Sequence, residues 1–387
     1  MYNFDEEVIR EGTNSLKFDF KEERKKPKSV IPMWVADMDF KVPNEVIDAL
    51  SQKALHGIFG YSESTDSYYI SIKKWFSKYN YEPKKEWLVK TPGMVFAVSC
   101  AISAFTKEGE GVLIQQPLYY PFAPTIEKKG RELVVNEIIL KNSKYEVDFD
   151  DFEKKIIENR VKLFILCSPH NPIMKSFTKE ELLKMGGICK KHGVIVFSDE
   201  IHADFVFSGE HRVFTTLDES FSQFSIISTS PTKTFNIPGL QITNNFIANE
   251  VLRKKFEEAV FKTGYSQPNI MGIVACEAAY TYGEEWFLQM KDYLQRNIIF
   301  LKSFIKERIP QIKIPPVEAT FLIWLDFSAF NKTNEQLEKI LLDAGVWLSN
   351  GVDFGVGGEG FMRINIGCTL KTLKEALRRI DCEELCR

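Results

Sequence analysis

The sequence lacks the features of exported, membrane-bound and fibrous proteins. Its first residues, Met1–Glu7, are acidic, so they do not resemble a signal peptide. No apolar run approaches the length that spans a bilayer, and no internal repeat or low-complexity segment occurs. These absences predict a globular protein of the cytoplasm without a membrane partner.

The sequence also lacks paired cysteines and a strong excess of one charge. Its seven cysteines are scattered without C-x-x-C spacing, which is typical of free thiols in a reducing compartment. Cys382 and Cys386 lie one helical turn apart but without nearby histidines, so we predict no metal site. The formal net charge is only −3, and we expect no nucleic-acid partner.

What the sequence does contain is a regular alternation of apolar, β-branched runs and helical patterns. With 387 residues and 44% hydrophobic content, it has the size and composition of a two-domain globular protein. Strands are predicted at residues 112–115, 133–139, 163–167, 194–198, 224–229 and 241–248. A capping box, Thr178 with Glu181, predicts the start of one intervening helix. The pattern favours an α/β fold with a mainly parallel sheet covered on both faces.

The pattern changes in the last third of the chain. Long helices are predicted from residue 269 to 282 and from 284 to 308, followed by strands and helices in a smaller α+β region. Prolines at positions 310, 315 and 316 mark the connecting loop. We therefore predict a large domain over residues 46–283, and a small domain formed by the arm 1–45 together with residues 284–387.

One lysine, Lys233, follows a predicted strand end among small and hydroxyl residues. A lysine held near the backbone loses charge because burial disfavours the ammonium form, and a neutral amine is needed to form a Schiff base with an aldehyde. Ser230, three residues earlier, can offer a hydroxyl to a phosphate. Together they indicate a lysine that holds pyridoxal phosphate (PLP). Ser-x-x-Lys alone, however, more often marks an ordinary surface lysine.

Polar residues follow two further predicted strands. Asn171 and Asp199 come directly after strands at 163–167 and 194–198, with His202 close behind. Ligands of α/β sheets bind outside the carboxyl ends of the strands, so these side chains are expected to converge with Lys233. A carboxylate can keep a pyridine nitrogen protonated, and an amide can bind a phenolic oxygen. Roles as a helix cap, a turn residue and a core histidine stay open for Asp199, Asn171 and His202.

Three more places carry candidate binding groups. Met94 and Val95 open a predicted helix after Gly93, where free N–H groups suit a phosphate, although a plain helix start is the alternative. Tyr119 follows another strand end and can lie against a cofactor ring or simply pack. Arg363 is a charge inside an apolar strand and needs an anionic partner, which a substrate carboxylate or a structural salt bridge would provide.

The sequence resembles the fold-type I PLP-dependent enzymes, and within them the MalY/PatB-like cystathionine β-lyases (C–S lyases). The resemblance covers nearly the whole chain. It implies a large domain with a mainly parallel seven-stranded sheet between helices, and a smaller α+β domain. The stretches that carry the resemblance are residues 32–40 (PMWVADMDF), 168–172 (SPHNP), 198–202 (SDEIH), 233–236 (KTFN) and 361–368 (FMRINIGC).

The resemblance implies a role for each candidate. Lys233 binds the cofactor, Asp199 pairs with the ring nitrogen, Asn171 with the phenolic oxygen, and Tyr119 stacks on the ring. His202 stands near the cofactor where related aminotransferases carry tyrosine. The phosphate site is implied to include Met94, Val95, Ser230 and, from a partner subunit, Tyr61. The substrate side is implied to include Arg363, which binds the α-carboxylate, with Ala36, Tyr120 and Asn171. The resemblance therefore also implies a homodimer in which each active site contains residues of both subunits.

Several positions depart from the family pattern. Met174 and Lys175 replace a usual glycine and arginine, Gln241 replaces an arginine that many aminotransferases use, and Pro238 and Thr369 are also unusual. These changes affect loop shape and selectivity rather than the cofactor. We predict a PLP-dependent β-lyase acting on cystathionine or related cysteine S-conjugates. An aminotransferase and a MalY-like protein with a regulatory binding role are the alternatives.

Overall fold

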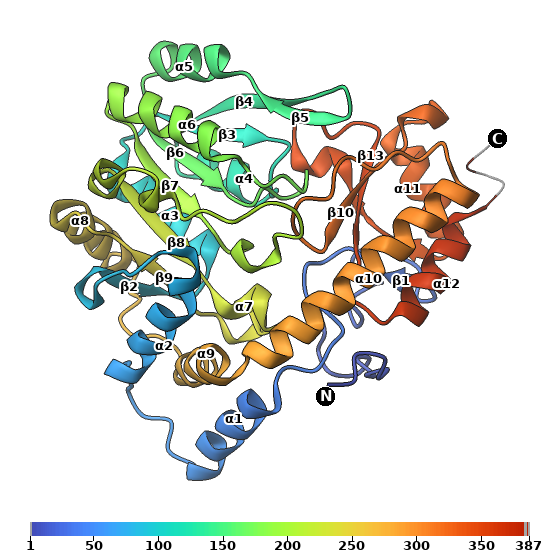
Figure 1. Ribbon diagram of the computed structural model, residues 1–387, viewed down its shortest axis with the longest axis horizontal. Coiled ribbons are helices and arrows are strands. Elements are labelled where there is room, and N and C mark those ends of the chain that lie inside the picture. Colours follow the sequence, from blue (N-terminus) through green and yellow to red (C-terminus); the bar gives the residue numbers. More distant parts are fainter. Residues whose placement is uncertain (1, 383–384, 386–387) are drawn as a thin grey trace.

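The computed structural model describes residues 2–382 and residue 385. Cys386, which was considered together with Cys382, lies outside the described residues. The chain forms a large sheet with helices on both faces, and a smaller α+β part beside it (Figure 1). In the described part of the chain, no helix combines the length and apolarity needed to cross a bilayer.

The large sheet contains eight strands, and five of them form parallel pairs with their neighbours. In spatial order the strands are β2 (Leu88–Thr91), β9 (Thr243–Phe246), β8 (Ser225–Thr229), β7 (Ile195–Asp199), β6 (Val161–Cys167), β3 (Gly111–Gln116), β4 (Glu132–Lys141) and β5 (Lys144–Val147). The pairs from β4 through β3, β6 and β7 to β8 are parallel, whereas β9, β2 and β5 join through antiparallel pairs. The predicted α/β class is confirmed.

The predicted count of seven strands is wrong by one edge strand. β5 folds back on β4 through a two-residue turn at Asn142 and Ser143, both with positive φ. Such hairpin turns usually contain glycine, so Asn-Ser gave no clear turn signal in the sequence. β2, at the opposite edge, was also not placed by the apolar pattern because it is only four residues long.

Alternate residues of the central strands supply two separate cores. In β6, Leu163 and Ile165 pack toward one face, and Phe164 and Leu166 toward the other, as the two-residue period of a strand requires. The first face is covered by α3 (Met94–Phe105), α4 (Phe122–Lys128) and α8 (Glu250–Phe261). The second is covered by α5 (Phe149–Glu158) and α6 (Lys179–His192). The predicted capping box of α6 is present.

Three helices form the end of the large sheet near β2 and β9. α1 (Asn44–His56) and α2 (Asp66–Phe76) both pack against α9 (Ile270–Tyr282). The following α10 (Glu284–Arg308) runs for 25 residues from α9 to α12 (Leu370–Ile380), across both parts of the molecule (Figure 1). The short α7 (Pro231–Thr234) directly follows β8 and contains Lys233.

The small part is built on an antiparallel sheet of β10 (Leu322–Asp326), β13 (Phe361–Asn365) and β12 (Ser349–Asn350). Its helices are α11 (Asn334–Asp343) and α12. The amino-terminal arm joins it, because β1 (Ile31–Pro32) pairs in parallel with β11 (Val346–Trp347). This pairing places residues 33–40 of the arm between the two sheets, beside Lys233.

Candidate active site

A cavity of about 480 Å³ opens at the carboxyl ends of the central strands. Because β6, β7 and β8 are parallel, the loops that follow them meet at one edge of the sheet. Most of the predicted site residues line this cavity: Ala36, Met94, Val95, Tyr119, Asn171, Asp199, His202 and Lys233. The convergence that the strand ends predicted is therefore present in the structure.

Lys233 is held against the arm rather than extended into water. Its Nζ donates a hydrogen bond to the backbone oxygen of Ala36, 2.8 Å away. Burial lowers the pKa of this amine to about 8, opposed by the nearby Asp37 carboxylate and reinforced by the Arg363 charge. A substantial share of neutral amine near pH 8 fits a lysine that reacts with an aldehyde. The hydrogen bond to Ala36 and the position of Lys233 on the wall of the cavity exclude the alternative of an ordinary surface lysine.

Asp199 ends β7 and is buried. Its Oδ1 accepts a hydrogen bond from the Ile201 N–H at 3.1 Å, and Oδ2 has no hydrogen-bond partner among the described residues. Burial raises the pKa of this carboxyl to about 7, a change that the Ile201 N–H opposes. A cationic or N–H group placed in the cavity would satisfy Oδ2 and lower that pKa, which is what a protonated ring nitrogen offers.

His202 is not a satisfied core histidine. It is buried, lines the cavity, and its Nδ1 has no hydrogen-bond partner within the described chain. Burial lowers the pKa of its imidazole to about 3, and the charges of Lys233 and Arg363 lower it further, so the ring is neutral. An unpaired buried nitrogen on a residue that lines a cavity marks a place where a ligand can supply the missing partner.

Arg363 is a buried arginine without a carboxylate partner. Its guanidinium donates to Asn171 Oδ1 at 3.0 Å, to the Trp34 backbone oxygen at 2.9 Å and to Ser349 Oγ at 3.2 Å. Its Nε has no partner, and over the described residues it forms no ion pair. Burial lowers the pKa of this guanidinium to about 10. The alternative of a structural salt bridge is therefore excluded, and a buried anion is missing.

The amino terminus of α3 forms another wall of the cavity. Gly93 precedes the helix, and Met94, Val95 and Phe96 of its first turn line the space. The first N–H groups of a helix have no partner within it and favour an anion. Thr232 and Thr243 line the same cavity and bring hydroxyls to it. The sequence did not single out either threonine, since isolated threonines near strand ends carry no signal.

Ser230 lies behind this wall. It caps α7, accepting from the Thr232 N–H, and its Oγ donates to the Ile242 backbone oxygen at 2.7 Å. Its predicted contact with a phosphate stays a prediction.

The aromatic candidates lie at different depths. Tyr119 lines the cavity, and burial raises the pKa of its phenol to about 12. Tyr120 is partly exposed and packs its ring edge-on to Phe354 near Arg363, with centroids 6.2 Å apart. Tyr61 is 97% exposed in the loop after α1, away from the cavity of its own chain.

The positions that depart from the family pattern are accommodated locally. Met174 adopts a positive φ, which explains why glycine is usual there, and its backbone oxygen accepts from Glu318 and Ala319. Lys175 forms an ion pair with Glu181 at 2.9 Å. Thr369 caps α12. Gln241 and Pro238 line the cavity itself.

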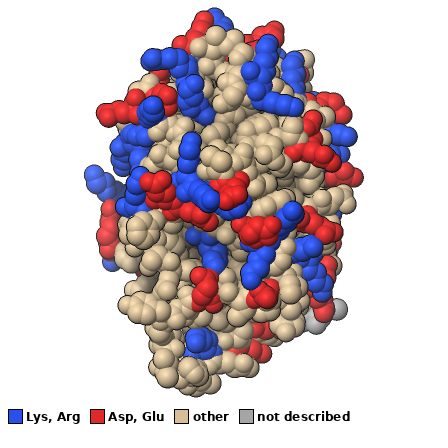
Figure 2. Space-filling model, turned by 90° about the vertical axis from the view of Figure 1, so that its left-hand side faces the viewer, with Lys and Arg blue, Asp and Glu red and all other residues tan. Residues whose placement is uncertain are grey.

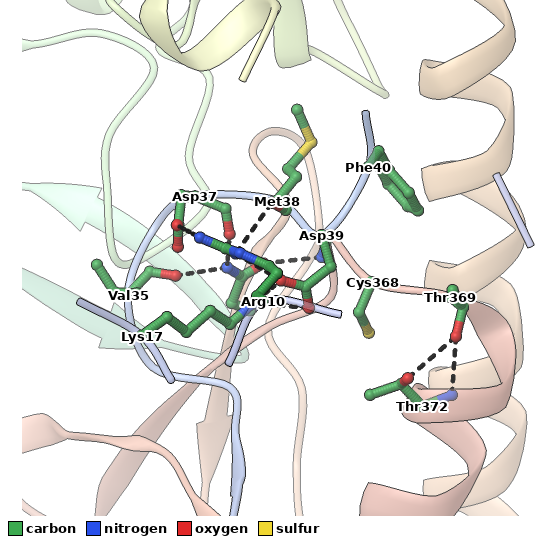
Figure 3. A network of polar contacts seen from close by, with 12 residues as sticks. Arg10, Lys17, Val35, Asp37, Met38, Asp39, Phe40, Cys368, Thr369 and Thr372 are labelled. Carbon is green, nitrogen blue, oxygen red and sulfur yellow. Dashed lines mark hydrogen bonds and ion pairs between the residues drawn. The ribbon is translucent and has the colours of Figure 1, made fainter. Parts of the chain in front are cut away.

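A polar network holds the arm against the site (Figure 3). Arg10 contacts both Asp37 and Asp39, with Nη1 2.7 Å from Asp39 Oδ1. The buried Lys17 bonds both oxygens of Asp39 at 2.9 Å. The Asn365 amide donates to the backbone oxygens of Val35 and Asp37. These contacts fix the segment whose Ala36 oxygen meets Lys233.

The family model for aminotransferase class I and II matches residues 28–380. The chain therefore belongs to this family. The match covers the arm, the large sheet and the small sheet, so every element that builds the cavity falls within it.

Two curated relatives place the chain more narrowly. It is 40% identical over 381 residues to cystathionine beta-lyase PatB of Bacillus subtilis (strain 168), covering 98% of each chain. It is 31% identical to protein MalY of Escherichia coli (strain K12), covering 97% of each. The solved structure of cystalysin from Treponema denticola, which contains a pyridoxal 5′-phosphate cofactor, superposes with a TM-score of 0.95 at 34% identity over 98% of each chain. The predicted MalY/PatB-like resemblance and fold type are confirmed.

Proposed function

We propose that the protein is a PLP-dependent carbon–sulfur β-lyase, which cleaves cystathionine or related cysteine S-conjugates to a thiol, pyruvate and ammonia. The observation that carries the proposal is a buried Arg363 without a carboxylate partner, which donates to Asn171 on the wall of the cavity that also holds Lys233. An amino acid brings the carboxylate that Arg363 lacks. The similarity to a cystathionine beta-lyase over 98% of the chain supports the reaction type.

The residues present fit PLP. When bound, PLP supplies an aldehyde for a lysine amine and a ring that accepts electrons from the substrate Cα. Lys233 would hold the aldehyde, and Asp199 would keep the ring nitrogen protonated. Asn171 and the unpaired nitrogen of His202 would form hydrogen bonds with the polar groups at the edge of the ring. Tyr119 covers the ring face. Met94 and Val95 bind the phosphate through their N–H groups, with Ser230 and the hydroxyls of Thr232 and Thr243.

The substrate groups follow from the same geometry. Arg363 binds the α-carboxylate with its free Nε and one further N–H, and Asn171 fixes the guanidinium in place. The Lys233 amine lies beside the Ala36 carbonyl, and its pKa is lowered to about 8, so it would take the α-proton of the substrate. PLP, when bound, would supply the ring that accepts the electrons of that C–H bond, and the substrate sulfur would leave with the electrons of the Cβ–S bond. Tyr120, at the rim, contacts the substrate.

A homodimer with shared sites belongs to the same proposal. The end of α1 and the following loop expose large apolar side chains: Leu55 (86% exposed), Ile58 (66%), Phe59 (60%) and Tyr61 (97%). Figure 2 shows few charged side chains at the lower end of this face, where α1 lies. Contiguous exposed apolar surface marks an interaction site. A second copy covers this surface, and its Tyr61 reaches the phosphate.

We place the protein in the cytoplasm, since its buried cysteines, Cys100, Cys167, Cys189, Cys276 and Cys368, are free thiols. The division into domains at residues 46–283 and at 1–45 with 284–387 is part of the proposal as well. It is supported by the pairing of β1 with β11.

The reaction type is tested by turnover without a keto acid. The purified protein with cystathionine and PLP is expected to release pyruvate and thiol continuously. An aminotransferase instead stops after one equivalent per site and resumes only when a keto acid is added. Two features favour the lyase outcome. Gln241 lies at the cavity where many aminotransferases have arginine, and no arginine is among the described residues that line the cavity.

A further inference from the structure

A second cavity lies on the far side of the Lys233 loop and is strongly basic. It has a volume of about 550 Å³ and is bounded by the end of α2, the start of α6, residues 203–217 and the middle of α10. Four cationic side chains line it: Lys78, Lys179, Arg212 and Lys291. Glu210 is the one carboxylate among the described lining residues. The active cavity described above shares no residue with it.

The positive charge of this cavity is only partly compensated. Lys78 forms an ion pair with the buried Asp204 at 2.8 Å, and Arg212 pairs with the exposed Glu210 at 3.0 Å. Within the described chain, Lys179 and Lys291 have neither an ion pair nor a hydrogen bond. Two cations therefore remain without an anion.

Lys291 lies over two aromatic rings, which attract its ammonium group but provide no countercharge. Its Nζ lies 5.8 Å from the Phe207 ring centroid and 5.7 Å from that of Phe287. Burial lowers its pKa, and the neighbouring Lys78 lowers it further. Asp204 opposes this but is already occupied, because it accepts from Lys78, Trp75, Tyr79 and Thr234. A bound anion would supply the missing countercharge.

The floor of the cavity contacts the catalytic loops through two buried interactions. Asp204 Oδ2 accepts a hydrogen bond from Thr234 Oγ1 at 2.6 Å, and Thr234 follows Lys233. His211 Nε2 lies 2.9 Å from Glu200 Oε2, and Glu200 follows Asp199. A ligand that draws Lys78 away from Asp204 therefore acts on a side chain bonded next to Lys233.

We infer that this cavity is an effector site for a small anion with two or more adjacent negative groups, such as a phosphate ester, a diphosphate or a polycarboxylate. Arg212 offers a bidentate fork, and the three lysines offer point charges around it. The volume exceeds what a single inorganic ion fills and lies in the range of small-molecule sites.

The test uses the PLP-loaded protein, so that the phosphate region of the active cavity is filled. Binding of inorganic diphosphate and of citrate is measured by calorimetry, with sodium chloride at matched ionic strength as the reference. We expect saturable binding of at least one of them, and the two arms separate phosphate from carboxylate chemistry. Lys291→Met and Lys179→Gln should each weaken this binding about tenfold, as expected for loss of one charged contact.

Lys302→Gln is the matched control, because Lys302 is an exposed lysine on the same helix away from the cavity. It should bind as the unchanged protein does. Lys179 is exposed, so its replacement tests the site even if Lys291→Met impairs folding. Absence of saturable binding, or equal binding by all variants, would overturn the site. Binding that leaves the visible absorption of the Lys233-bound cofactor unchanged would overturn the coupling. Neither readout depends on lyase activity.

Discussion

The amine of Lys233 is expected to capture its cofactor at a lower pH than an ordinary lysine would. Because burial lowers its pKa to about 8, the neutral form increases as pH rises through 8 and dominates above it. The rate at which cofactor-free protein binds PLP, followed by visible absorption, should therefore rise with a midpoint near pH 8 and then level off. A rate still climbing toward the pKa of an ordinary lysine, near 10.4, would contradict this.

The covalent bond between Lys233 and PLP can be tested by chemical reduction. Borohydride reduction of the loaded protein should fix the cofactor to the peptide that contains Lys233, and Lys233→Ala should abolish the label.

Arg363 is expected to act on the substrate and not on the cofactor. Arg363→Lys keeps a positive charge but loses the planar fork, so the KM for an amino-acid substrate should rise tenfold or more while PLP absorption is unchanged. Arg253→Lys is a suitable control, since Arg253 also donates to backbone oxygens, those of Ile247 and Ala248, but outside the cavity. An unaltered KM in Arg363→Lys would remove the proposed carboxylate site.

How far single residues can be predicted depends on the signal each one carries. Lys233, Asp199, Asn171 and Arg363 were found because a polar group after an apolar strand, or within one, is costly unless it is used. Thr232 and Thr243 were missed because a threonine is unremarkable in either place.

At the scale of elements, the arm is held by a buried ion pair that should contribute strongly to stability. Lys17 is 1% exposed, and Asp39 is the carboxylate it contacts. Asp39→Asn leaves a buried ammonium without countercharge, which typically costs roughly 3–5 kcal/mol in the free energy of unfolding. The midpoint of urea unfolding should fall accordingly, and adding Lys17→Met should restore part of it.

The control for this change is the exposed pair of Lys339 and Asp343 on α11, with side chains 76% and 63% exposed. Asp343→Asn should leave the urea midpoint nearly unchanged, because exposed pairs contribute little. Equal effects of the two substitutions would show that burial of Lys17 does not stabilise the arm.

Elements with a local signal were predicted well, and elements defined by pairing were not. The capping box Thr178–Glu181 located the start of α6, and the helix predicted at 284–308 has the observed bounds of α10. β1 and β11 are two residues each and exist only because they pair across more than three hundred residues. The local sequence of neither strand predicts that contact.

At the scale of the whole molecule, the cavity is assembled from distant parts of one chain. The arm contributes Ala36, and the large sheet contributes Asp199 and Lys233. Arg363 of the small sheet donates a hydrogen bond to Asn171, which lines the cavity. The convergence of Asp199, Asn171 and Lys233 at one edge of the large sheet was predictable from the polar strand ends. The approach of the small sheet was not, because it depends on packing between elements rather than on any single segment.

The last prediction concerns two copies of this molecule. Tyr61 is 97% exposed and stands among exposed apolar residues, so a role for it requires a partner subunit. A Tyr61→Ala dimer lacks the tyrosine at both sites, and a Lys233→Ala dimer lacks the lysine at both. After subunit exchange, half of the dimers in an equal mixture are hybrids, and each combines one intact lysine with one intact tyrosine in a single site. Activity should then recover to about a quarter of that of the unchanged protein.

Mixing two preparations of the same variant is the control and should restore nothing. If Tyr61 acted within its own chain, every site of a hybrid dimer would lack either the lysine or the tyrosine, as in the parent dimers. The mixture would then show only the mean of the two parental activities. Size-exclusion chromatography with light scattering gives the mass of each species, and a monomer at working concentration would contradict shared sites directly. We expect a dimer instead, because burying Ile58 and Phe59 of the apolar loop around Tyr61 against a second copy removes apolar surface from water.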